Sequence, residues 1–520
     1  MAVGMLNRRA ILALSLAAAG YPGLAACTVQ NEAEKRGSGH GGSSSGADSG
    51  NSSSSAGDGG GGTISTGPQQ QLVGAAGVTI RELALYQGVK RPLMENGAVA
   101  DSDIPVVQGR DALIRVFVDT DESYDGGPVT ARLELEGQPP LEIVKSLGSS
   151  SSDSSLGSTI NFEIPGDAMV PGTGYRVALL QLGEAAGENP AAVFPATGTK
   201  SLDVAAAATT LHVKLIPLEY SADGSNRVPS TSDAQIQRYR DLFYGMYPLS
   251  KVTISVHDTV SGVGELSPDG NGWESLVQSL ADFRNDENAA DDVYYYGIFN
   301  PASSLNAYCA NGCVLGLAFD ITGPADVYGR VAIGVGFNGS VAVETAVHEI
   351  GHVHGRYHAP SCGAQGTDPN FPSNNGKIGS WGYDIVEKDL FSPTAAYDLM
   401  GYCSPYWVSD YTYKALFSRL KFVNSASAVF PPETLNRTYE RVRVDANGVA
   451  TFLEPITLRK PPMAQSKSVV LESGAGAQTV VGQLYTYDHL EGGLVFWPQP
   501  AQPSNRATIE IAGRQISAIR

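Results

Sequence analysis

The sequence predicts a multidomain chain of α/β plus all-β class, in which a twisted, mostly parallel sheet with its helices is flanked by two β-sandwich-like domains. Three observations predict this arrangement. Strands and helices alternate from about residue 208 to 422, short strands separated by turns fill the stretches on either side, and a Gly- and Ser-rich segment precedes all of them. About 450 residues follow that segment, which is enough for two or three domains.

Short strands dominate the first folded stretch. Val78–Tyr86, Ala112–Val118 and Val129–Leu135 alternate polar and apolar residues or are β-branched, and Gly-Pro and Gly-Gly breaks separate such runs. The Ser-rich run 149–158 predicts a long exposed loop. We expect a β-sandwich without catalytic chemistry, because the polar residues form no cluster of metal-ligand or nucleophile type.

The central stretch predicts a sheet with helices. Leu211–Leu218 is an apolar strand, and Ser232 or Asp233 can cap a helix whose apolar residues follow helical spacing. The other predicted strands are Lys251–Val256, Val293–Phe299, Leu315–Phe319 and Val331–Phe337, and the other helices are Trp273–Phe283, Val341–His354 and Tyr411–Leu420.

The last stretch returns to short strands. Arg441–Val444 and Val449–Phe452 flank Asp445-Ala446-Asn447-Gly448, which is a strong hairpin signal. Pro-Pro pairs at 431 and 461 mark boundaries. A second β-sandwich or a small barrel is expected here.

The most informative stretch is 348–358, where His348-Glu349-x-x-His352 is followed by Gly355 and His358. On a helix His348 and His352 lie one turn apart on the same face, so both imidazoles can bind one zinc ion. Glu349 can take a proton from a metal-bound water, and Gly355 permits the left-handed turn that returns His358 as a third ligand. With 8 histidines and 60 glycines in the chain, chance assembly of these five positions has odds of about one in a hundred thousand.

This extended motif resembles that of the metzincin metallopeptidases. The resemblance implies a catalytic domain with one zinc ion, and the strand–helix order before the motif is similar to the N-terminal half of such a domain. It also implies an antiparallel edge strand that pairs with the substrate backbone; Leu315–Phe319 and Val331–Phe337 are both candidates. The order of domains is loosely similar to that of bacterial metzincins that cut mucin-type glycoproteins. The subfamily stays open, because Ala359, not an acidic residue, follows the third histidine.

A second mark of the clan is a methionine turn, and the run 397–403 resembles it, with Met400 lying 42 residues after His358. The resemblance implies that Met400 forms an apolar floor under the three imidazoles. It also implies that Tyr402 is a switchable tyrosine, which contacts the metal or stabilises the oxyanion. Taken alone, Met400 would be interpreted as ordinary core packing.

Other residues near the motif have competing interpretations. His354 lies on a different helix face from His348 and is interpreted as structural. Glu344, one turn before His348, is either an acceptor that supports that imidazole or an exposed glutamate. Tyr406 and Trp407 either wall the substrate pocket, as the resemblance implies, or pack in the core.

Residues 1–26 are predicted to be a targeting signal, because a short positive stretch precedes an apolar run too short to span a membrane. Leu24-Ala25-Ala26-Cys27 resembles the lipobox of bacterial lipoproteins, which implies cleavage before Cys27 and lipidation of its thiol. A plain secretory signal with the same cleavage point is the alternative. Because Thr28 is not the aspartate that retains lipoproteins in the inner membrane, we expect an exported bacterial lipoprotein at the outer membrane or cell surface.

The segment after Cys27 is mostly Gly, Ser and small polar residues, which bury too little apolar surface to offset chain entropy, so a disordered tether is predicted. The predicted divisions are the lipoprotein signal peptide 1–26, the tether 27–72, an N-terminal β-sandwich-like domain 73–205, the metzincin-type catalytic domain 206–422 and a C-terminal β domain 423–520.

Four cysteines remain besides Cys27, an even number for an oxidising compartment. Three pairings are possible. We favour disulfides between Cys362 and Cys403 and between Cys309 and Cys313. A second zinc site at Cys309 and Cys313 is a weaker alternative, since no further Cys or His cluster accompanies them.

The formal net charge of −18 argues against nucleic acid or anionic lipid as a partner. We expect a monomeric zinc-dependent endopeptidase that is held to the membrane by its lipid anchor and hydrolyses extracellular protein or glycoprotein substrates. Its zinc ligands are His348, His352 and His358, and its catalytic residues are Glu349 and Tyr402. The alternative is a surface binding lipoprotein whose metzincin-like domain recognises protein or glycan without efficient cleavage.

Overall fold

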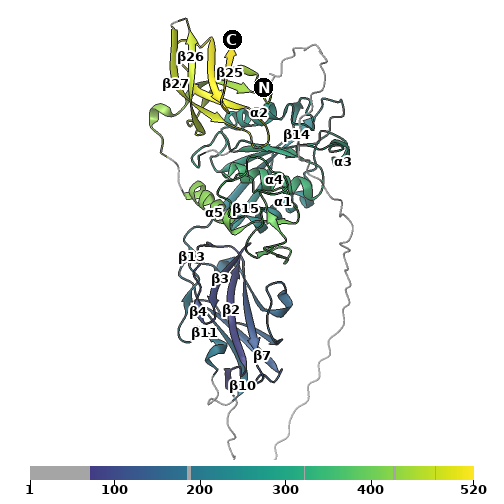
Figure 1. Cartoon of the computed structure of the whole chain (residues 1–520), viewed down its shortest axis with the longest axis vertical. Helices are drawn as coiled ribbons and strands as arrows, with labels where there is room; N and C mark the ends of the chain where they lie inside the picture. The colour runs from purple at the N-terminus through teal and green to yellow at the C-terminus, as the bar shows by residue number, and fades with distance from the viewer. Residues whose placement is uncertain (1–70, 184–188, 321–322, 426–428, 475) are drawn as a thin grey trace, which may run out of the picture.

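The computed structural model describes residues 71–183, 189–320, 323–425, 429–474 and 476–520. Its folded part has three portions stacked along one long axis, with the first strands at one end and the last strands at the other (Figure 1). The predicted signal peptide, Cys27 and the tether up to residue 70 lie outside the described residues. None of the described helices is long and apolar enough to cross a membrane.

The fold-class prediction is wrong. Strands make up 39% of the molecule and helices 17%, and several of the sheets are antiparallel, so the chain is a mostly-β protein, not an α/β protein built on a mostly parallel metzincin sheet. The reason is that strand–helix alternation is confined to one part of the chain. Before and after that part, short turns join neighbouring strands, and a short turn allows only antiparallel pairing.

Two antiparallel sheets form most of the N-terminal portion. They bury a common apolar core that includes Leu83, Val116, Leu133 and Val177, as expected when alternating strands turn one face inwards. One sheet has the order β4-β3-β2-β6-β9, and the other follows β1-β10-β7-β8 with β11 and β12 beside β10. The strands are β1 (Gln71–Gly74), β2 (Val78–Tyr86), β3 (Lys90–Glu95), β4 (Ala98–Val99), β6 (Ala112–Thr120), β7 (Pro128–Leu135), β8 (Leu141–Ser146), β9 (Ile160–Ile164), β10 (Gly174–Gly183), β11 (Val193–Phe194) and β12 (Lys200–Ser201), and a separate parallel pair is formed by β5 (Val106–Val107) and β13 (Val204–Ala205).

The central sheet follows the order β15-β14-β17-β19-β18. Strand β14 pairs in parallel with β15 and β17, and β17 pairs in parallel with β19, whereas β18 runs antiparallel to β19 at the edge. Of the two candidates for the antiparallel edge, β18 therefore takes the position, because β19 lies between β17 and β18. The strands are β14 (Thr210–Tyr220), β15 (Lys251–Val256), β17 (Val293–Phe299), β18 (Gly316–Ala318) and β19 (Val331–Val335), and β16 (Val260–Val263) pairs with the end of β14.

Helices pack against this sheet in two separate apolar clusters. One cluster joins α1 and α4 to β14 and β17, and the other joins α2 to β17 and β19. The predicted cap of α1 is present, because the Ser232 hydroxyl accepts a hydrogen bond from the amide of Gln235. Each large apolar side chain buried by a helix, such as Ile350 of α4, contributes about 1.5–3 kcal/mol. The helices are α1 (Asp233–Met246), α2 (Trp273–Asp286), α3 (Leu305–Tyr308), α4 (Ser340–Val353) and α5 (Asp410–Ser425).

The C-terminal portion is one antiparallel sheet of order β25-β24-β28-β27-β26-β29-β30. Its first and last strands, β25 and β30, contact each other, so the sheet curls into a partial barrel. The predicted hairpin is present as β24 and β25. The strands are β24 (Arg437–Val444), β25 (Ala450–Leu458), β26 (Gln465–Ser473), β27 (Gly476–Tyr485), β28 (Gly493–Pro498), β29 (Arg506–Ile511) and β30 (Arg514–Ile519).

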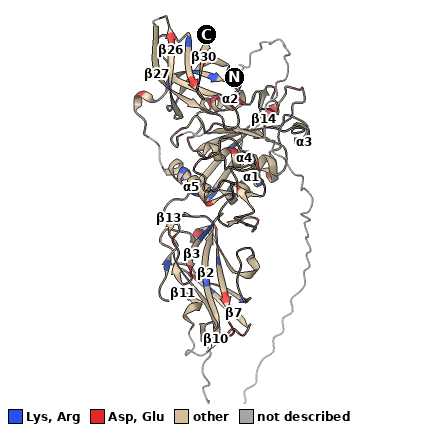
Figure 2. Cartoon of the chain, viewed as in Figure 1, with Lys and Arg blue, Asp and Glu red and all other residues tan. Residues whose placement is uncertain are grey.

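The C-terminal sheet docks firmly on the central portion. Tyr485 and Phe496 of that sheet share an apolar cluster with Phe319 and Tyr328 of the central portion. The Arg441 guanidinium also lies 2.5 Å from the carboxylate of Asp282 in α2. Acidic and basic residues occur in all three portions of the molecule (Figure 2), so the charge is not confined to one of them.

Candidate metal centre

The motif 348–358 lies on α4 and the turn that follows it. The helix ends at Val353, and Gly355 has φ of 84°, a left-handed conformation that favours glycine. A Cβ at Gly355 would also lie 2.6 Å from the Arg419 guanidinium. The turn is therefore specific for glycine, and it brings His358 back beside the helix.

The three motif histidines converge. The Nε2 atom of His352 lies 3.1 Å from that of His348 and 3.0 Å from that of His358. Each Nδ1 atom faces a backbone carbonyl oxygen. The pairs are His348 with Leu399 at 2.8 Å, His352 with Arg356 at 2.7 Å and His358 with Gln365 at 2.6 Å. Since each Nδ1 donates its proton to a carbonyl, each Nε2 presents a lone pair to the same point.

These three nitrogens fit a metal ion. Lone pairs this close repel one another unless a cation lies between them. Nitrogen ligands about 2.0–2.1 Å from a tetrahedral metal lie about 3.4 Å apart, and the observed separations of 3.0 and 3.1 Å are close to that value. The histidines also supply the neutral form that a metal needs, because burial lowers the pKa of His348 to about 3 and that of His352 to about 4.

Glu349 lies beside the converging imidazoles and is almost completely buried, with 1% of its surface exposed. Burial, and then the neighbouring carboxylate of Asp488, raise its pKa. Within the described part of the chain, Glu349 Oε2 has no hydrogen-bond partner. The edge strand makes room for this side chain, because a Cβ at Gly316 of β18 would lie 2.3 Å from Glu349 Oε1.

The turn around Met400 supports the site from below. Met400 is buried, and its sulfur lies so close to α4 that a Cβ at Gly351 would meet it at 2.4 Å. The turn is held by Asp398, whose carboxylate accepts hydrogen bonds from the amides of Met400 at 2.8 Å and Ser409 at 3.0 Å. Leu399, which lies between Asp398 and Met400 in the sequence, provides the carbonyl that orients His348.

Tyr402 contacts one of the converging imidazoles. Its hydroxyl is 3.1 Å from Nε2 of His358 and 2.7 Å from Nδ1 of His489. The structure therefore places this hydroxyl next to the point on which the histidines converge.

Two residues of the loop between β27 and β28 also reach this centre, and neither was predicted from the sequence. Asp488 and His489 follow β27, and the side chain of Asp488 is only 1% exposed. Possible metal-binding groups of the described residues are His352, His358 and Asp488; His348, His358 and His489; and Glu349, Asp488 and His489. The Asp-His pair lies in a loop between two strands, far along the sequence from the motif 348–358. No fixed spacing links the two, so the sequence alone does not predict that this pair contacts the motif.

Both favoured disulfides are present, Cys362–Cys403 and Cys309–Cys313. The first ties the segment after His358 to the residue after Tyr402. The second leaves Cys309 and Cys313 without the thiolates that a zinc site would need.

The other residues near the motif make structural contacts. His354 is buried. Its Nδ1 atom lies 2.8 Å from the carbonyl oxygen of Ile350, and its ring stacks on that of Tyr294. Glu344 bonds to the Tyr406 hydroxyl and does not support His348. Trp407 packs in the apolar core against Phe391 and donates from Nε1 to the carbonyl of Gly88.

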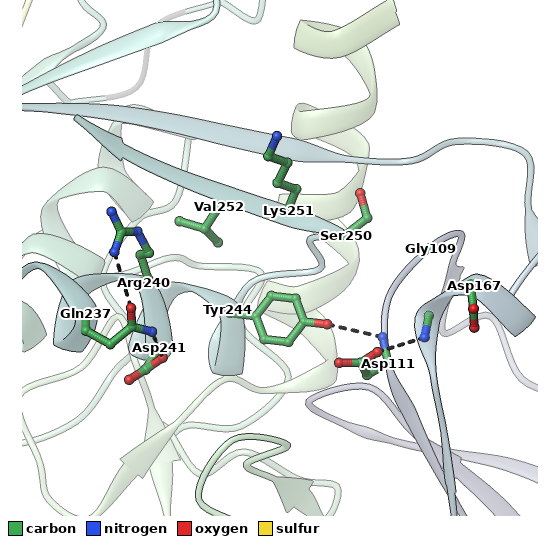
Figure 3. Close-up of a pocket in the computed structure, with 11 residues that line it drawn as sticks. Gly109, Asp111, Asp167, Gln237, Arg240, Asp241, Tyr244, Ser250, Lys251 and Val252 are labelled. Carbon is green, nitrogen blue, oxygen red and sulfur yellow. Dashed lines mark hydrogen bonds between the residues drawn. The ribbon is translucent and has the colours of Figure 1, made fainter.

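A cavity of about 450 Å³ lies elsewhere, at the junction of the N-terminal and central portions (Figure 3). Its polar groups bond to one another: the Tyr244 hydroxyl accepts from the amide of Asp111, and Arg240 donates to Gln237. No residue of the histidine cluster lines it. The lining residues are Gly109, Asp111, Gly166, Asp167, Gln237, Arg240, Asp241, Tyr244, Ser250, Lys251 and Val252.

No protein-family model matches the chain, and no curated protein matches it. Among solved structures, the chain is similar to metalloproteinase-II from Bacteroides fragilis at 16% sequence identity, over 50% of this chain and 78% of that chain, with a TM-score of 0.21. A TM-score this low carries no argument about fold or function, so the functional interpretation depends on the residues of the site.

Proposed function

We propose that the protein is a zinc-dependent endopeptidase that hydrolyses extracellular protein or glycoprotein substrates at a bacterial surface. The observation that carries the proposal is the convergence of three imidazole lone pairs beside a buried carboxylate. Three neutral nitrogen ligands at tetrahedral spacing suit zinc. A fourth position is then left for the reaction.

A bound zinc ion supplies a Lewis acid that polarises the scissile carbonyl and lowers the pKa of the attacking water. Glu349 acts as the general base and takes the proton of that water on its carboxylate. The raised pKa of Glu349 suits this role, because the protonated acid can then give the proton to the leaving amine. Tyr402, whose hydroxyl lies 3.1 Å from Nε2 of His358, donates a hydrogen bond to the oxyanion.

Strand β18 is the proposed binding edge for the peptide. It lies at the edge of the central sheet and next to Glu349 through Gly316. An extended peptide that adds to this edge gains main-chain hydrogen bonds without a sequence requirement. Such binding favours an endopeptidase that cuts within extended segments of a protein.

The proposed location rests on the sequence. The lipobox-like residues ending at Cys27 support a lipid anchor, and the Gly- and Ser-rich segment after them supports a tether that holds the enzyme away from the membrane. The two disulfides are typical of proteins that fold in an oxidising compartment.

The proposal is tested with the purified full-length chain. We expect one zinc per chain by inductively coupled plasma mass spectrometry, and digestion of casein or mucin that stops with 1,10-phenanthroline and returns on addition of zinc. Glu349→Ala should keep the zinc and lose the digestion. Stoichiometric zinc without proteolysis of any substrate, both in the wild-type chain and when Asp488 is replaced by asparagine, would refute the peptidase and favour the surface binding protein instead.

A further inference from the structure

The loop between β27 and β28 lies along the edge strand on which a substrate is proposed to bind. The amide of Asp320 donates to the carbonyl of Thr486 at 2.7 Å, and the amide of Asp488 donates to the carbonyl of Ala318 at 3.3 Å. The amide of Ala318 donates to Oδ1 of Asp488 at 2.7 Å. Residues 486–488 thus run antiparallel to the edge and take up the main-chain groups that an added peptide strand would use.

The loop is anchored by a buried aromatic residue. The ring of Tyr487 stacks on that of Phe319, with centroids 5.7 Å apart, and 5% of Tyr487 is exposed. The same two residues form an antiparallel bridge. This contact holds the loop in one register, which sets the position of the next residue, Asp488.

The Asp488 carboxylate faces the three imidazoles. Its Oδ2 atom lies 3.5 Å from Nε2 of His352 and 2.9 Å from Nε2 of His489. Ligands of a tetrahedral metal are about 3.4 Å apart, so Oδ2 lies where a fourth ligand would. A cation between a buried carboxylate oxygen and nitrogen lone pairs that face it would stabilise this arrangement.

His489 holds the groups that the proposed reaction uses. Its Nδ1 atom is 2.7 Å from the Tyr402 hydroxyl. Its Nε2 atom is 2.9 Å from Oδ2 of Asp488 and 3.5 Å from Oε1 of Glu349. Since both ring nitrogens face protein groups, His489 bridges the base, the tyrosine and the carboxylate.

We propose that the β27–β28 loop is a built-in inhibitor of this enzyme, in which Asp488 is the fourth metal ligand and residues 486–488 occupy the substrate edge. The inference rests on the proposed function. It assigns the C-terminal sheet a role: the sheet docks on the central portion and presents the loop to the metal centre. The loop must leave the edge before a peptide can bind there.

The test compares the full chain with Asp488→Asn, which keeps the size of the side chain and removes its charge. Glu491→Gln, an exposed position in the same loop, is the matched control. We expect Asp488→Asn to change the visible absorption of the cobalt-loaded protein, to release zinc to a chelator about ten to a hundred times faster, and to hydrolyse a quenched fluorescent peptide at least about tenfold faster, because the fourth position and the edge become accessible. Glu491→Gln should match the wild type in all three.

A measurement on the wild-type chain does not depend on how the variant folds. Hydrogen exchange of the peptide that contains residues 486–489 should slow at least about tenfold when zinc is added to the metal-free protein, because a metal-bound Asp488 fixes the loop. Equal exchange with and without zinc would overturn the inference.

The outcomes separate this inference from the proposed function. Suppose that the wild type is active and that Asp488→Asn has the same cobalt spectrum, the same rate of zinc release and the same rate of hydrolysis. The inhibitor loop is then refuted, and the peptidase stands. Faster zinc release with no gain in hydrolysis by an active enzyme makes Asp488 a permanent ligand and also overturns the inhibitor. If Asp488→Asn changes the spectrum and the zinc release but neither protein cuts any substrate, Asp488 is a ligand and the peptidase is refuted.

Discussion

Replacement of Asp398 by alanine is expected to loosen the turn beneath the metal centre. The side chain is fully buried, and its carboxylate accepts the amides of Met400 at 2.8 Å and Ser409 at 3.0 Å. Its loss leaves two buried N–H groups without an acceptor, at about 1–3 kcal/mol each, so the free energy of unfolding should fall by about 4 kcal/mol. For a domain of about 200 residues, such a loss lowers Tm by about 8–16 °C.

The matched control is Asp445→Ala. The Asp445 carboxylate also accepts two backbone amides, those of Asn447 at 2.9 Å and Val449 at 2.8 Å, but these bonds are exposed in a hairpin. Water replaces them at little cost, so Asp445→Ala should change the free energy of unfolding by about 0.5 kcal/mol. Each variant therefore loses two bonds to backbone amides, and the two sites differ in burial.

The assay is thermal unfolding followed by circular dichroism, together with zinc affinity by chelator competition. Because the Leu399 carbonyl orients His348, Asp398→Ala should also weaken zinc binding about ten- to a hundredfold. The turn is not held by this carboxylate if Asp398→Ala has the same Tm as the Asp445→Ala control, or if it binds zinc as tightly as the wild type.

Four further variants test the centre and its support. Glu349→Ala should lower turnover by at least about a hundredfold and keep its zinc, since only the base is lost. His352→Ala should lose zinc and activity together. The zinc content and the casein digestion of each variant are measured. Gly316→Ala should lower kcat by about a hundredfold with zinc retained, because the new Cβ would lie 2.3 Å from Glu349 Oε1 and would displace the base; full turnover in this variant would contradict the proposed position of the base. Replacement of Cys362 and Cys403 by serine should destabilise the protein by about 4 kcal/mol through the lost constraint on a loop of sequence separation 41; an unchanged melting curve would contradict this estimate.

Several elements could be predicted because their signals are local. The helix expected at 341–354 is observed at Ser340–Val353, and the strand expected at Val78–Tyr86 is observed there. Apolar periodicity and capping residues act over a few residues, so they can be recognised in the sequence. The predicted fold class was wrong because antiparallel sheets on both sides of the stretch in which strands and helices alternate make the chain mostly β.

The sequence by itself determined the local geometry of the site. His348 and His352 are four residues apart on one helix, and Gly355 permits the left-handed turn before His358, so the backbone alone brings these imidazoles together. Only the tertiary structure decided that β18 is the edge strand, that Leu399 orients His348, and that Asp488 reaches the centre. Ala318 and Asp488 are 170 residues apart, and their contact depends on how the C-terminal sheet docks. That docking results from the burial of many apolar side chains together, so no short sequence motif predicts it.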